Sequence, residues 1–116
     1  MDPAIASLTE ALRRFAAERA WEPFHSPKNL AAALSVEAAE LLEHFQWLTE
    51  DQSRHLTADQ RAAVAHEAAD VFLYLLQLAD KLQIDLAQAA WEKLALNDAK
   101  YPAAQVWGSS RKYDER

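Results

Sequence analysis

Acidic side chains in two segments of the sequence share a spacing that suits metal-dependent chemistry. Glu37 and Glu40 are three residues apart, and so are Glu67 and Asp70. On a helix this spacing puts both carboxylates of a pair on one face. Both pairs lie on or beside the apolar stripe that should face the core, where unpaired carboxylates are costly and repel one another. A hard divalent cation relieves both problems, and an all-oxygen ligand set favours Mg²⁺ or Mn²⁺ over zinc.

This acidic quartet (Glu37, Glu40, Glu67 and Asp70) has two other interpretations. Salt bridges on a solvated face are the usual fate of a single Glu-x-x-Glu pair, but two pairs that both follow apolar stripes favour a metal. A di-iron bundle needs Glu-x-x-His on two helices, and neither pair has a His at its third place. We therefore expect Mg²⁺ at the quartet, with Mn²⁺ as a substitute.

Helix-breaking and capping residues place four helices around these carboxylates. Asp2-Pro3 opens the first, through residue 20, and Ser26-Pro27 opens the second, over about 28–48. A capping box at residues 57–60 begins the third, to about 83, and Asp85 begins the fourth, to about 100. We expect a single all-α domain, a four-helix bundle, over 1–102 and an irregular tail over 103–116. The third helix is apolar nearly all round over 71–79, which predicts an oligomer, either a homodimer or a homotetramer.

Composition agrees with one all-α domain and limits its partners. The 116 residues are 51% hydrophobic and contain one Gly and four Pro, too few for the turns of a multi-stranded sheet. A formal net charge of −6 argues against binding nucleic acid as a polymer or an acidic membrane surface. No apolar run approaches the roughly 20 residues of a membrane span. The chain has no Cys and starts without a signal-peptide pattern, so we expect a cytoplasmic protein.

The segments around the quartet resemble one family. Residues 21–30 (WEPFHSPKNL) precede the first acidic pair, residues 44–47 (HFQW) follow it, and residues 70–75 (DVFLYL) begin within the second. In this order, with Glu-x-x-Glu and then Glu-x-x-Asp, they are similar to the MazG-like all-α nucleoside triphosphate pyrophosphohydrolases, most of all their dCTP pyrophosphatase branch. The resemblance covers about residues 12–113. One departure is Leu12, where the better-known animal members have a His.

The resemblance implies hydrolysis of a nucleoside triphosphate to the monophosphate and pyrophosphate, with Mg²⁺ at the quartet. The implied substrate is dCTP or a modified pyrimidine deoxynucleotide, removed from the nucleotide pool. Phosphoryl transfer needs neutralised phosphate charge and a positioned water, and clustered carboxylates with Mg²⁺ supply both. Two alternatives stay open: a non-catalytic nucleotide-binding or helical interaction module, and an all-α dUTP or broad-range triphosphatase. The quartet favours an enzyme, because a scaffold has no use for four inward carboxylates.

The resemblance also assigns residues to the two ends of the nucleotide. The polar face of the fourth helix is implied to bind phosphates, although a solvated stripe is the plain alternative; it comprises Lys93, Asn97 and Lys100. Arg111 and Lys112 of the tail could close over the same phosphates as a flap. Aromatic groups near loops and helix ends suit stacking on a base; they are Trp21, Phe24, His25 and Trp47, joined by the hydroxyl of Tyr74. Phe24 and Trp47 could equally be core residues, and Tyr74 a buried, satisfied tyrosine.

Overall fold

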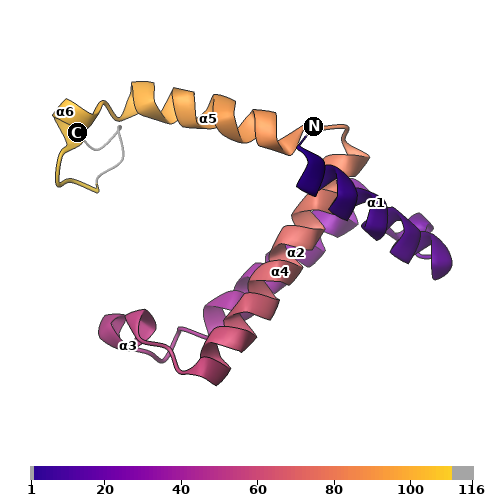
Figure 1. The fold of residues 1–116 in the computed structure, drawn as a ribbon, viewed down its shortest axis with the longest axis horizontal. Coiled ribbons are helices and arrows are strands. Elements are labelled where there is room, and N and C mark those ends of the chain that lie inside the picture. Colours follow the sequence, from indigo (N-terminus) through magenta and orange to yellow (C-terminus); the bar gives the residue numbers. More distant parts are fainter. Residues whose placement is uncertain (1, 111–116) are drawn as a thin grey trace.

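The regular elements of this computed structural model, which describes residues 2–110, are all helical (Figure 1). In chain order they are α1 (Pro3–Glu18), the 3-10 turn η1 (Glu22–Phe24), α2 (Pro27–Glu43), α3 (Glu50–Arg54), α4 (Ala58–Lys81), α5 (Leu86–Lys100) and α6 (Ala103–Val106). The all-α fold class predicted from the sequence is confirmed.

The four long helices begin where capping side chains predict. At α1 the Asp2 carboxylate accepts a hydrogen bond from the backbone N–H of Ala4 at 2.9 Å. The same kind of cap begins the other three, formed by Ser26, Thr57 and Asp85. A further capping box, between Thr49 and Gln52, begins the short α3 inside a segment that sequence patterning describes only as polar.

Two of these helices end just before a left-handed residue that is not Gly, which the sequence pattern does not predict. Ala20 and Gln83 both have φ of 55°, the left-handed conformation that usually selects Gly. The backbone N–H of Trp21 then donates to Ala16 O, at 3.0 Å. α1 and α4 therefore stop two residues before the predicted ends, at Glu18 and Lys81. α2 stops at Glu43, and hydrogen-bonded turns replace helix over 44–47.

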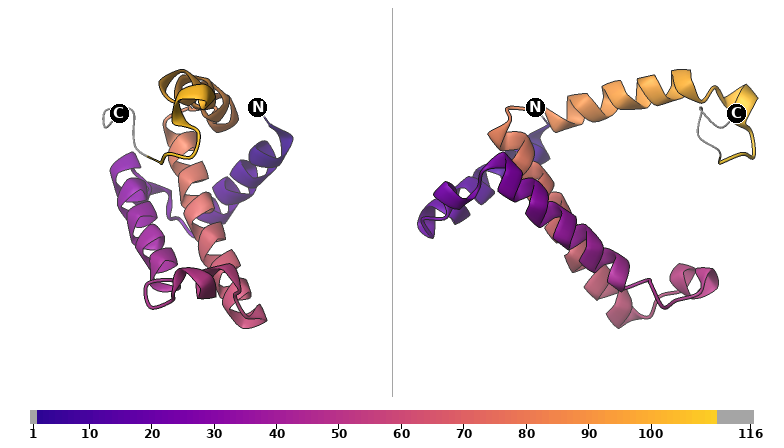
Figure 2. Two further views of the ribbon diagram at one scale, coloured as in Figure 1. Left: turned by 90° about the vertical axis from the view of Figure 1, so that its left-hand side faces the viewer. Right: turned by 180° about the vertical axis from the view of Figure 1, so that it is seen from behind.

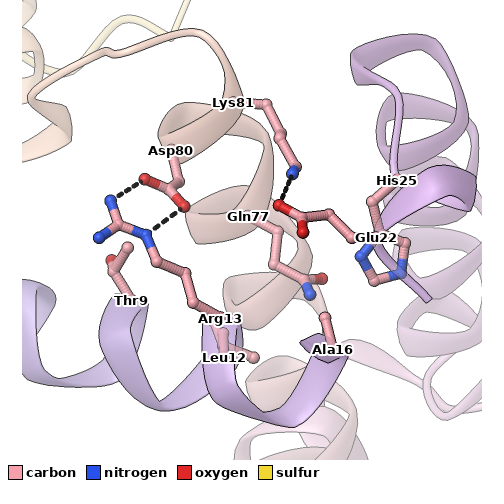
Figure 3. A pocket seen from close by; sticks show the side chains of 9 residues that line it. All are labelled: Thr9, Leu12, Arg13, Ala16, Glu22, His25, Gln77, Asp80 and Lys81. Atoms are coloured by element: carbon pink, nitrogen blue, oxygen red, sulfur yellow. Dashed lines mark hydrogen bonds and ion pairs between the residues drawn. The ribbon is translucent and has the colours of Figure 1, made fainter. Parts of the chain in front are cut away.

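α4 is the central helix of the packed part of the chain. α2 runs beside it and α1 crosses it near its C-terminal end (Figures 1 and 2). Leu30 of α2 and Leu76 of α4, each 1% exposed, are the largest side chains in the core of the described residues. Two ion pairs connect α1 and η1 to the end of α4 (Figure 3). The Arg13 guanidinium donates to both carboxylate oxygens of Asp80, and Lys81 Nζ lies 3.1 Å from Glu22 Oε1.

α5 projects away from this body (Figures 1 and 2), so the fourth predicted helix does not close a bundle within one chain. Its apolar side chains are exposed, Trp91 by 74% and Leu96 by 59%. The radius of gyration is 17.6 Å, against about 13 Å expected for a compact chain of this length. α6 occupies part of the tail that we expected to be irregular, and Arg111 and Lys112 lie outside the described residues.

α4 is also the one described helix that is long and apolar enough to cross a membrane. Its 18-residue window has a mean hydropathy of 1.2, and 11% of the window is buried. Core helices of soluble proteins pass the same test of length and composition. The face of α4 towards α2 carries the Glu67 carboxylate, a costly group to place in hydrocarbon. The expectation that the protein has no membrane partner stays a prediction.

Candidate active site

Three members of the acidic quartet come together between α2 and α4. Oxygens of Glu37, Glu67 and Asp70 all lie within 4.8 Å of one another. The two helices run side by side, so each pair, spaced by one helical turn, presents its carboxylates to the other. Glu40 lies on the more exposed edge of α2, near enough to Glu67 to act on its ionisation.

The electrostatics of the cluster show a deficit of positive charge. Glu37 Oε2 and Glu67 Oε1 are buried and have no hydrogen-bond donor among the described residues. The neighbouring carboxyls of Glu37 first and Glu40 second favour the protonated form of Glu67, and burial acts in the same direction. Together they raise the pKa of Glu67 to about 7.

These residues fit a hard divalent cation. The donor set is entirely carboxylate oxygen, which suits Mg²⁺ and Mn²⁺. The two buried oxygens without donors are the stronger observation, because buried acceptors are normally satisfied and an unsatisfied one is costly. A cation between α2 and α4 would satisfy both oxygens and remove the repulsion. Glu37, Glu67 and Asp70 could hold it, with Glu40 at the edge.

A cavity of about 400 Å³ lies next to the cluster, with Asp70 in its wall. Its volume is in the range of small-molecule sites. Of the predicted nucleoside residues, Trp21, His25 and Tyr74 line it. The Trp21 ring packs edge-on against Phe15, with ring centroids 5.8 Å apart, which holds one aromatic face of the cavity in place. The wall contributed by α1 is apolar.

The remaining predicted site residues lie elsewhere in a single chain. Phe24 and Trp47 are outside the cavity, exposed by 66% and 86%, and so neither is a core residue of the described chain. The proposed phosphate face of α5, which comprises Lys93, Asn97 and Lys100, projects from the body with that helix (Figure 1). Arg111 and Lys112 are outside the described residues. The roles of these residues stay predictions.

Comparison with known proteins identifies the family. A profile described as the MazG-like family matches residues 32–115, which include the whole acidic quartet. The chain belongs to the MazG-like family. The resemblance predicted from the flanking motifs is thereby confirmed.

Curated relatives of this MazG-like chain match almost its full length. Human dCTP pyrophosphatase 1 is 40% identical over 116 residues, covering 98% of this chain and 68% of the human protein. The mouse protein of the same name is also 40% identical, with the same coverage. A solved pyrophosphatase structure from Archaeoglobus fulgidus is 39% identical and has a TM-score of 0.81, covering 88% of this chain and 95% of that one.

Sequence reasoning missed two features of this MazG-like site. The apolar wall of the cavity comes from α1, through Leu8, Leu12 and Phe15, none of which was among the predicted site residues. Gln77 of α4 also lines the cavity. Its position was a usable signal, because it follows Asp70 by seven residues and Tyr74 by three and so shares their helix face.

Proposed function

We propose that this protein is a Mg²⁺-dependent pyrophosphohydrolase that cleaves dCTP, or a modified pyrimidine deoxynucleoside triphosphate, to the monophosphate and pyrophosphate. The observation that carries the proposal is the pair of buried, donorless oxygens on Glu37 and Glu67, beside a cavity of about 400 Å³ with an aromatic wall. Carboxylates that bind a cation can hold the phosphates of a nucleotide through that cation, and the cavity is of a size to hold the nucleoside.

The enzyme class follows from the family and the fold. The chain is a nucleoside triphosphate pyrophosphohydrolase that acts on deoxynucleotides, because it shares family and fold with named pyrophosphatases at about 40% identity over nearly its full length. The preference for dCTP is the finer part, and it is supported by the names of the human and mouse relatives.

The chain's own residues divide the work between the two ends of the nucleotide. The indole of Trp21 offers a face for stacking on the base, and the Tyr74 hydroxyl, one turn beyond Asp70, points the same way as the carboxylates along α4. Bound Mg²⁺ would neutralise the phosphate oxygens and orient the attacking water. A carboxylate of the quartet accepts the proton of that water.

A second copy of the chain completes the site in this proposal. Lys93 and Asn97 are the residues expected to bind phosphates, yet they lie on the projecting α5. The same helix exposes Trp91, and only 11% of the apolar window of α4 is buried. Association through these surfaces would bury both and carry Lys93 to the carboxylates of a partner. We propose a homodimer or a homotetramer on this basis.

The proposed setting is the cytoplasm, with free nucleotides as the substrate. With the quartet neutralised by a cation, 12 basic residues face 14 acidic ones. That balance still lacks the excess of positive charge that binds nucleic acid as a polymer.

The test is a panel of deoxynucleoside and nucleoside triphosphates with Mg²⁺, followed by pyrophosphate release. We expect turnover with dCTP or its 5-substituted forms preferred, and loss of turnover in Glu37→Ala. Glu43→Gln, an exposed carboxylate change on the same helix, serves as the matched control. A preference for dUTP, or equal turnover of all bases, would support the alternative of a dUTP or broad-range triphosphatase. Binding without turnover by the wild type would support the non-catalytic module.

A further inference from the structure

The cavity beside the acidic cluster has few groups that can recognise a base by hydrogen bonding. The side chains contributed by α1 are all apolar, Leu8, Leu12 and Phe15 among them. Polar side chains come from α4 and from the segment around η1. Because Asp70 belongs to the acidic cluster, recognition of the base edge must come from the remaining polar groups on these two elements.

Gln77 is placed at the far end of a polar row on α4. Asp70, Tyr74 and Gln77 follow one another at spacings of four and three residues, on one helix face. Seven residues of helix rise by about 10 Å, the order of the distance from the α-phosphate of a nucleotide to the outer edge of its base. A nucleotide whose phosphates lie at Asp70 therefore brings its base edge towards Gln77.

The Gln77 carboxamide is partly buried and has no hydrogen bond to any of residues 2–110. It extends from α4 towards Ala16 of α1, between the Arg13–Asp80 and Lys81–Glu22 ion pairs (Figure 3), yet joins neither pair. Besides the nucleoside cavity, it lines the adjoining small cavity of about 30 Å³. An amide with no partner in the described chain is available to a ligand, which can bond to its donor and to its acceptor.

We propose that Gln77 is a base-recognition residue that hydrogen-bonds the Watson–Crick edge of the bound pyrimidine; this rests on the proposed function. A carboxamide presents an N–H donor beside a C=O acceptor. Cytosine offers the complement, with N3 as an acceptor beside its 4-amino donor. Uracil offers the reversed pair, which the amide matches by turning over. No hydrogen bond within the described chain holds Gln77 in one orientation, so it can bind either pyrimidine, and a preference for cytosine over uracil comes from other groups of the cavity.

The experiment measures binding of deoxycytidine monophosphate, the product, to the full chain with Mg²⁺, by calorimetry or from the change in tryptophan fluorescence, to which Trp21 in the cavity wall contributes. Gln77→Leu keeps the size of the side chain and removes its hydrogen bonds. We expect its Kd for this nucleotide to rise about 5- to 30-fold, with Kd for deoxyribose 5-phosphate, which has no base, unchanged. Gln105→Leu, on the exposed α6, is the matched control and leaves both Kd values unchanged.

A second ligand separates base recognition from helix packing. The pyrimidin-2-one nucleotide lacks only the 4-amino group, so the wild type should bind it several-fold more weakly than deoxycytidine monophosphate. Gln77→Leu should bind the two equally, because the partner of that amino group is gone. A Gln77→Leu variant that still discriminates between them, or loses affinity equally for deoxyribose 5-phosphate, would overturn the assignment. These measurements do not require turnover. A wild type without activity would contradict the proposed function, whereas the comparison of Kd values would still test whether Gln77 binds the base.

Discussion

Replacing Glu37 with Gln should stabilise the metal-free protein while abolishing its response to Mg²⁺. In the metal-free protein, Glu37 Oε2 and Glu67 Oε1 are buried acceptors without donors. The amide of Glu37→Gln supplies a donor within 4.8 Å of the partner carboxylates and removes one negative charge. An unsatisfied buried acceptor costs about 1–3 kcal/mol, so we expect a gain of ~1–2 kcal/mol in the free energy of unfolding. That corresponds to a rise of roughly 3–10 °C in Tm.

The assay is thermal unfolding at pH 8 and fixed protein concentration, after chelation and again with Mg²⁺. The pH matters because the folded-state pKa of Glu67 is raised to about 7, above about 4.3 in an unfolded chain. Protonation of Glu67 therefore stabilises the metal-free fold at low pH, and this stabilisation is lost as the pH rises through about 7. Repulsion is then greatest at pH 8. Mg²⁺ at a hundred times its Kd should stabilise the wild type by about 2.7 kcal/mol.

Glu43→Gln, on the same helix and exposed, should change neither the Tm nor the response to Mg²⁺. Two results would refute the reasoning. One is a Glu37→Gln variant that is less stable than the wild type without metal, which would mean that the carboxylate is satisfied. The other is an equal Mg²⁺ response in variant and wild type, which would place the cation elsewhere.

Three further predictions concern other parts of the chain. An equal mixture of the inactive Glu37→Gln and Lys93→Ala variants, dissociated and reassociated, should recover on the order of a quarter of wild-type turnover if each site combines two chains. Half of the dimers are then mixed, and each mixed dimer has one intact site of two. No recovery would put both residues in one chain's site. Ala20→Gly should raise the free energy of unfolding by about 0.5–1 kcal/mol, because Ala20 is left-handed at φ 55°; chemical denaturation measures it, and a loss of stability would contradict the end assigned to α1. The hydrogen bonds from Arg13 hold the pKa of Asp80 below its usual value. The stabilisation they give is therefore present above about pH 4 and disappears as the pH falls through the lowered pKa. Urea unfolding should show Arg13→Met less stable than the wild type at pH 7, with the difference shrinking towards pH 3; a difference that stays constant would exclude this linkage.

Local signals in the sequence were sufficient to predict the four long helices and the acidic cluster. Asp2, Ser26, Thr57 and Asp85 each form the cap that their position suggests, because a cap is decided within four residues. The quartet could be anticipated for a related reason: helical spacing fixes which side chains share a face, and carboxylates on an apolar stripe demand an explanation.

The features that escaped prediction depend on contacts or on unusual backbone. Ala20 and Gln83 reverse the chain without the Gly that normally marks such an end, so nothing in their residue types indicates it. The amphipathic pattern of α5 shows that it needs an apolar partner but not which chain provides one, and the helix projects instead of closing the bundle. Gln77 on an apolar helix looks like an ordinary solvated residue until the cavity beside it is known.

The identity of the products of dCTP hydrolysis tests the central claim most directly. Wild-type protein is incubated with dCTP and Mg²⁺, and the phosphorus-containing products are resolved by ³¹P NMR, with Glu37→Gln alongside. Cleavage at the α–β anhydride, as proposed, predicts deoxycytidine monophosphate and pyrophosphate in equal amounts from the wild type and none from the variant. Stepwise release of inorganic phosphate through the diphosphate, or the same products at the same rate from Glu37→Gln, would contradict it.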